Sequence, residues 1–127
     1  MSQTLPNADI TRIPHAWPGR VPGTKWRGLI SVAAVASDDS QGFADQCRST
    51  FARLDLLLGQ LQSSKRSILS AAIHITTMEN KAEFDRLWLE WIGDNPAHWP
   101  QRTCVQGGLA ARYLVEIQLT AAEEELA

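Results

Sequence analysis

Apolar residues recur at steps of three and four along two segments of the chain. The first segment runs from Phe43 to Leu61 and the second from Asn80 to Gly93, and this spacing places the apolar residues of each on one face of an α-helix. Asp38-Asp39-Ser40 offers candidate N-caps before the first segment, and a glycine closes the second. The pattern therefore predicts two amphipathic helices.

Shorter apolar or alternating runs predict the strands. A Pro/Gly-punctuated stretch, residues 17–25, is expected to be a loop. Two alternating runs at 100–106 and 113–119 flank a Gly-Gly pair and have the pattern of a β-hairpin. Strands are expected at 9–14, 29–35 and 68–76 and in this hairpin. The order β-β-α-β-α-β-β is typical of an α+β domain, with both helices on one face of a mixed sheet.

Each arm of the predicted hairpin carries one ionisable residue among apolar neighbours, Arg102 on the first and Glu116 on the second. A turn centred near Leu109 would place them directly opposite each other on one face. Such a pair is either a structural salt bridge or an anion site. In the second case the guanidinium binds a carboxylate bidentately and the glutamate holds and deprotonates a water.

Composition narrows the class of protein. With 127 residues, 44% hydrophobic, 20% charged and a formal net charge of −2, the chain fits one domain. We expect a tail at 1–8, the domain at 9–122 and an acidic tail at 123–127. The basic residues are scattered along the sequence, so we expect no clustered positive surface that would bind nucleic acid. No secretory signal and no apolar run of roughly 18 residues is present, so we expect a cytoplasmic protein without a membrane partner.

Other reactive side chains give weaker signals. The three histidines lack metal-site spacing, so no metal is expected. Cys104 shares a strand face with Arg102, which would lower the pKa of its thiol, although a packed cysteine is the simpler interpretation. Trp17, Trp26 and Trp99 fall in or beside loops, where an aromatic ring lines either a cavity or an interface.

At Pro100–Val105 and Tyr113–Ile117 the chain resembles the YjgF/RidA family of enamine/imine deaminases, and within it the YoaB-like branch. The first segment matches the family's proline-x-arginine strand, and the second matches its valine-glutamate-isoleucine strand. Further similarity at 64–69, 84–91 and 105–109 extends the resemblance from about Ile10 to Ala122.

The resemblance implies a chorismate-mutase-like fold assembled as a homotrimer, with sites in the clefts between subunits. It also implies a hydrolase that converts 2-enamino and 2-imino acids to 2-keto acids and ammonia without a cofactor. In that scheme Arg102 binds the substrate carboxylate. The backbone carbonyl of Cys104 holds the substrate nitrogen or the attacking water, and Glu116 positions that water.

The chain also departs from the family pattern. Many members carry Ser-Gly-Gln where this chain has Ser31-Val32-Ala33, so Ser31 keeps a polar contact while two residues that shape the site are replaced. The nearest counterpart of the family's N-terminal tyrosine is Trp17. The retained arginine and glutamate favour an enzyme that clears reactive intermediates. The altered segment favours a non-catalytic trimer that binds small carboxylates or hydrophobic metabolites, or acts as a sensor or chaperone-like protein.

Overall fold

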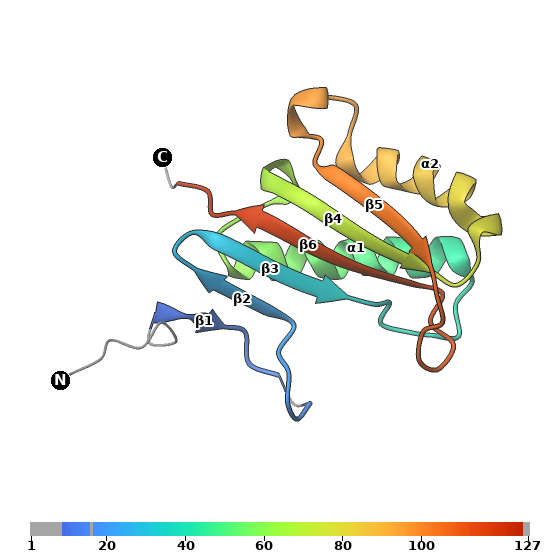
Figure 1. Cartoon of the computed structure of the whole chain (residues 1–127), viewed down its shortest axis with the longest axis horizontal. Coiled ribbons are helices and arrows are strands. Elements are labelled where there is room, and N and C mark those ends of the chain that lie inside the picture. Colours follow the sequence, from blue (N-terminus) through green and yellow to red (C-terminus); the bar gives the residue numbers. More distant parts are fainter. Residues whose placement is uncertain (1–8, 16, 126–127) are drawn as a thin grey trace.

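In the part of the chain that the structure describes, six β-strands form one sheet, and two α-helices pack on one of its faces (Figure 1). The computed structural model describes residues 9–15 and 17–125, so the expected tail at 1–8 lies outside it. Three 3₁₀ turns, Lys65–Ser67, Met78–Asn80 and Pro96–His98, connect the main elements. These elements are β1 (Thr11–Arg12), β2 (Gly23–Trp26), β3 (Leu29–Ala34), α1 (Phe43–Gln60), β4 (Ile68–Ile75), α2 (Lys81–Ile92), β5 (Gln101–Gln106) and β6 (Val115–Ala122).

The spatial order of the strands is β1-β2-β3-β6-β4-β5. All neighbouring strands are antiparallel except β4 and β5, which run parallel because α2 carries the chain back over the sheet between them. Figure 1 shows β5 at one edge and β1 at the other. The mixed sheet predicted from the element order is thus confirmed.

The core lies between the sheet and the two helices. Alternate residues of β3, β4 and β6 face the helices, and the apolar stripes of α1 and α2 cover them. Gly93, with φ of 88°, ends α2 in a conformation that favours glycine. The largest fully buried side chains include Ile30, Leu54, Leu58, Ile73, Phe84, Leu87, Ile117 and Leu119.

Two predictions of local structure are wrong. Residues 17–25 are not entirely a loop, because β2 begins at Gly23 and pairs with both β1 and β3. The predicted hairpin does not form, because β4 lies between β5 and β6 and pairs with each of them. Residues 107–114 are long enough to carry the chain past the end of β4, so the two alternating runs are not neighbours.

The acidic segment after β6 contacts the domain, in contrast to the solvated tail that its composition suggests. Glu123 forms an ion pair with Lys25 at 2.6 Å, and Glu124 accepts hydrogen bonds from the hydroxyls of Ser64 and Ser67, each at 2.6 Å. These hydroxyls lower the pKa of Glu124. Among the residues that the structure describes, no helix is both long and apolar enough to span a bilayer.

Candidate active site

Arg102 lies on the edge strand β5, and its side chain turns toward α2. Its register partner on β4 is the core residue Ala71, so the guanidinium is on the helix-covered face of the sheet. Its Cζ lies 5.5 Å from the ring centroids of both Phe84 and Trp88. The side chain is 22% exposed. The group is therefore neither in bulk solvent nor sealed in the core.

Asp85 of α2 binds the guanidinium. Its Oδ1 lies 2.5 Å from Nη2 of Arg102, and its Oδ2 lies 2.7 Å from Nζ of Lys81, one turn earlier on the helix. Burial raises the pKa of Asp85, but hydrogen bonds from Lys81 and Arg102 outweigh this effect, and its pKa lies below the ordinary value. Two cations and one carboxylate leave this cluster with one net positive charge, which favours binding of a further anion.

A cavity of about 300 Å³ opens beside Arg102. Trp99 helps to form its wall and is fixed there, because its Nε1 donates to the carbonyl of Gly93 at 2.8 Å. A small carboxylate in this cavity reaches the guanidinium while its organic part contacts aromatic and aliphatic carbons. Apart from Arg102 and Asp85, the wall consists of Trp88, Leu89, Ile92, Trp99 and Pro100.

The thiol and the backbone carbonyl of Cys104 differ in how well they are suited to take part in a reaction. Burial raises the pKa of the thiol, and the nearby Arg102 does not reverse that shift, so the lowered thiol pKa is wrong and the simpler interpretation of a packed cysteine is favoured. The carbonyl is better placed. In a parallel strand, residues two positions apart direct their backbone N–H and C=O groups to the same side. Gly107 donates its N–H to the carbonyl of Ile75 on β4, so the backbone groups of every second residue before it also face β4. Cys104 lies in the other set, and its N–H and C=O therefore point away from β4, to the outer edge of the sheet.

Glu116 lies on the opposite face of the sheet from Arg102. It sits on β6 between the fully buried Val115 and Ile117, and its register partner on β4 is the exposed His74. The predicted contact between Arg102 and Glu116 is therefore wrong, both as a salt bridge and as a site within one chain. The physical reason is the strand order, which inserts β4 between the two strands.

A second cavity, of about 490 Å³, lies at the Glu116 carboxylate. Trp17 is part of its wall, together with Tyr113 and the basic residues Arg20 and Arg53. Trp17 is 47% exposed and its ring is covered by the guanidinium of Arg20, whose Cζ is 4.7 Å from the ring centroid. Within the described part of the chain, the carboxylate of Glu116 makes no hydrogen bond or ion pair, although its backbone pairs within the sheet. The structure thus brings Trp17 and Glu116 to one cavity.

Ser31 shares the uncovered sheet face with Glu116 but does not line that cavity. It lies opposite Thr120 of β6, and its hydroxyl is 3.5 Å from Nε2 of Gln118. The cavity wall on β3 is formed instead by Ala33 and its neighbours at 34–35. Ala33 is one of the residues that departs from the family pattern.

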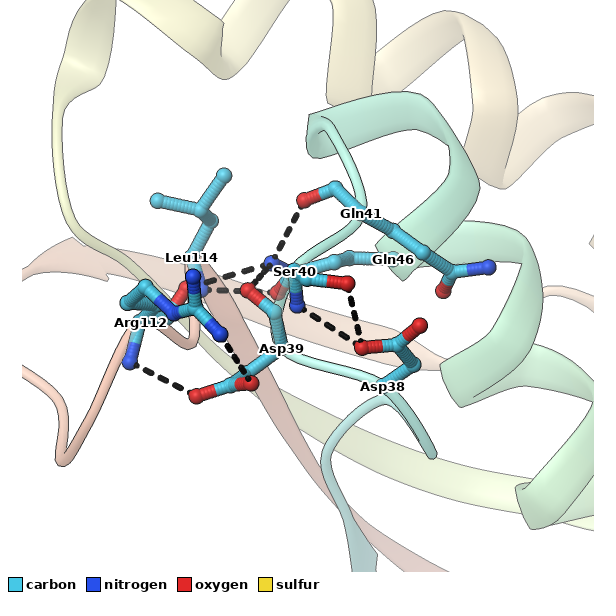
Figure 2. A network of polar contacts seen from close by, with 7 residues as sticks. All are labelled: Asp38, Asp39, Ser40, Gln41, Gln46, Arg112 and Leu114. Carbon is cyan, nitrogen blue, oxygen red and sulfur yellow. Dashed lines mark hydrogen bonds and ion pairs between the residues drawn. The ribbon is translucent and has the colours of Figure 1, made fainter.

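A buried amide fixes the loop at residues 107–114, which bounds the Glu116 cavity (Figure 2). Gln46 of α1 is fully buried, and its Nε2 donates to the carbonyls of Asp39, Gln41 and Arg112. Its Oε1 accepts from the N–H of Leu114 at 2.9 Å. The carboxylate of Asp39 accepts further hydrogen bonds from the backbone N–H and the guanidinium of Arg112. This network ties the entry of β6 to the start of α1.

No group of three metal-ligating side chains occurs among residues 9–15 and 17–125. His15 instead packs on Trp17, with ring centroids 3.9 Å apart. The polar groups that the two cavities and the β5 edge present include a guanidinium, a carboxylate and an outward backbone carbonyl.

Comparison with known proteins places this set of residues in a family. The profile described as Endoribonuclease L-PSP matches residues 21–123. The RutC family protein YoaB of Escherichia coli (strain K12) is 35% identical over 85 residues, covering 66% of this chain and 72% of that protein. A RutC family protein of Haemophilus ducreyi is 32% identical over 89 residues, covering 69% and 74%. The chain belongs to this family, the YjgF/RidA family that its two strand motifs resemble.

Solved structures have the same fold. NMB1025, a member of the YjgF protein family from Neisseria meningitidis, matches with a TM-score of 0.84 and 28% identity over 93% of this chain and 98% of its own. Rv2704 of Mycobacterium tuberculosis, a member of the YjgF/YER057c/UK114 family, matches with a TM-score of 0.79 over 89% and 98%. At 21% identity, that second likeness supports the fold alone.

Two residues of the site were not found by sequence reasoning. Asp85 stands four positions after Lys81, a spacing that signals a helical ion pair, but nothing in the sequence shows that Arg102 reaches it. Gln46 is a polar residue inside the apolar stripe of the first helix, one position before Cys47. That interruption is a usable signal, because a buried amide must find hydrogen-bond partners.

Proposed function

We propose that this protein hydrolyses reactive 2-enamino and 2-imino acids to 2-keto acids and ammonia, at a site shared by two copies of the chain. The observation that carries the proposal is the position of Arg102, a partly buried guanidinium at the mouth of a cavity. The cluster around it keeps one net positive charge, and arginine is the side chain best suited to bind a carboxylate bidentately.

The arrangement of the two charged groups supports a site between chains. Arg102 is at the β5 edge on the helix-covered face, whereas Glu116 is on the uncovered face, so one chain does not bring them together. The uncovered face carries the exposed apolar side chains Trp26, Leu29 and Val105, which favour association with another copy. A homotrimer, as the family resemblance implies, would place the β5 edge of one subunit against the Glu116 cavity of the next.

In this mechanism the substrate carboxylate binds Arg102, and the outward carbonyl of Cys104 accepts a hydrogen bond from the substrate nitrogen or from the water. Glu116 of the adjacent subunit orients that water and takes its proton as the oxygen adds to the imine carbon. This proton passes to nitrogen and gives the tetrahedral adduct; Glu116 then transfers the hydroxyl proton of the adduct to the same nitrogen as the C–N bond breaks, so the oxygen becomes the keto group and ammonia leaves. The products are a 2-keto acid and ammonia. Trp17, which is part of the wall of the Glu116 cavity, would contact the substrate from the uncovered face, whereas Ser31 lies on the same face but outside this cavity.

The direct test measures keto-acid release from 2-iminopropionate generated in the assay by an amino-acid oxidase. We expect the wild-type protein to accelerate release over buffer, and Arg102→Ala to lose roughly 10- to 100-fold in rate because the carboxylate loses a charge-assisted partner. Arg86→Ala is the matched control, since Arg86 is an exposed arginine of α2 outside both cavities. It should retain the wild-type rate.

The outcomes separate the two candidate functions. Acceleration that requires Arg102 but not Arg86 supports the deaminase. Binding of 2-keto acids without acceleration for any imino acid would identify the non-catalytic carboxylate binder instead. An RNA substrate is disfavoured, because the net charge is −2 and the basic residues are scattered along the chain.

A further inference from the structure

We propose that the substrate side chain occupies the cavity beside Arg102, and that the protein therefore prefers 2-imino acids with bulky branched or aromatic side chains. The inference rests on the proposed function and specifies its substrate class. The cavity holds the carboxylate-binding guanidinium and an apolar wall within one chain, so one small molecule contacts both.

The wall explains the expected preference for size. At about 300 Å³ the cavity is at the small end of the range for ligand sites, yet it is far larger than a methyl group needs. Trp88 and Trp99 offer indole surfaces, and Leu89 and Ile92 offer aliphatic ones. An isobutyl or benzyl group would remove much of this surface from water, whereas a methyl group would leave it hydrated.

Charge explains the expected rejection of acidic side chains. Asp85 and Arg102 are the charged residues that line the cavity, and Asp85 already engages both Arg102 and Lys81. One substrate carboxylate neutralises the remaining positive charge of this cluster. A second carboxylate would meet Asp85 and the apolar wall without a cation to pair with, and that arrangement is unfavourable.

The experiment compares kcat/KM for four imino acids that carry methyl, isobutyl, benzyl or carboxymethyl side chains, all produced in the assay by amino-acid oxidases. We expect the isobutyl and benzyl substrates to exceed the methyl substrate by about tenfold or more. The carboxymethyl substrate should be the poorest of the four.

A variant of the wall tests whether the cavity causes the preference. Leu89 is 49% exposed, so Leu89→Glu adds a charge to the wall without disturbing the core. It should lower kcat/KM for the isobutyl and benzyl substrates about tenfold more than for the methyl substrate, because the polar wall opposes bulky apolar groups, whereas the new charge beside Arg102 weakens binding of every substrate carboxylate. The matched control is Leu56→Glu, the same change at an exposed leucine of α1 outside both cavities. It should alter neither.

Calorimetric binding of the stable products 4-methyl-2-oxovalerate and pyruvate separates failure of this inference from failure of the proposed function. If the protein turns over no imino acid but binds 4-methyl-2-oxovalerate more tightly than pyruvate, and Leu89→Glu loses this preference, the deaminase proposal fails and the cavity assignment is supported. Turnover with equal kcat/KM for methyl and isobutyl substrates keeps the deaminase and overturns the assignment. If neither turnover nor a binding preference is observed, both the deaminase proposal and the cavity assignment are overturned.

Discussion

Replacing Gln46 with methionine removes four hydrogen bonds from the interior while nearly preserving side-chain length. The two shortest join Oε1 to the N–H of Leu114 at 2.9 Å and Nε2 to the carbonyl of Gln41 at 3.0 Å. Each buried backbone group left without a partner costs about 1–3 kcal/mol. We expect Gln46→Met to lower the free energy of unfolding by about 2–4 kcal/mol, a large share of the roughly 5–15 kcal/mol of a typical domain.

Urea unfolding followed by tryptophan fluorescence measures this loss. It must be performed at one fixed protein concentration, because self-association adds to the apparent stability. With a slope of about 2 kcal/mol per molar urea, the midpoint should fall by about 1–2 M at an unchanged slope. Gln60→Met, an exposed change on the same helix, should stay within about 0.5 kcal/mol of the wild type.

Hydrogen exchange at the Leu114 amide provides a local readout for the same variant. Its exchange should accelerate in Gln46→Met more than that of the core amides of β6, since the network of Figure 2 anchors the loop at this point. Equal midpoints for Gln46→Met and Gln60→Met, with unchanged exchange at Leu114, would refute the view that this amide holds the loop.

Two further predictions concern titration and thiol reactivity. The lowered pKa of Asp85 means that its ionised form adds stability above the unfolded-state pKa, so the wild type should exceed Asp85→Asn by up to about 1 kcal/mol in urea titrations at pH 7. This difference should begin to shrink near pH 4 and vanish once the pH is below the lowered folded-state pKa; a difference that persists in strong acid would contradict the ion pair with Arg102. Burial raises the pKa of Cys104 and, with a contribution from Glu83, raises that of Cys47 to about 12, so iodoacetamide should label both slowly at neutral pH, and Cys104→Ala should retain activity within about twofold; rapid labelling or lost turnover would indicate thiol chemistry.

Local periodicity predicted most of the elements because burial on one face leaves a direct pattern in the sequence. The helix expected at Phe43–Leu61 is observed at Phe43–Gln60, and the strand expected at 29–35 is observed at Leu29–Ala34. The short β2 was missed because its residues, Gly-Thr-Lys-Trp, follow a Pro/Gly-rich stretch and lack alternation. Its strand conformation comes from pairing with two neighbours rather than from its own side chains.

Strand order was the feature that the sequence did not reveal. The alternation around Arg102 and Glu116 correctly predicted strands but carries no information on which strands pair. The glycines at 107 and 108 favour a hairpin of the two runs, whereas in the structure β4 lies between them in the sheet and pairs with both. Adjacency in the sequence does not determine adjacency in the sheet, and because β4 lies between β5 and β6, the two charges lie on opposite faces.

Mixed assemblies of two impaired variants test the central proposal, a site built from two chains, most directly. Arg102→Ala and Glu116→Gln, each expected to retain at most about a tenth of the wild-type activity alone, would be unfolded, mixed in equal amounts and refolded, and imine hydrolysis measured. If each site takes its guanidinium from one subunit and its carboxylate from the next, random assembly should restore about a quarter of the wild-type activity. A mixture no more active than either variant alone would contradict the shared site.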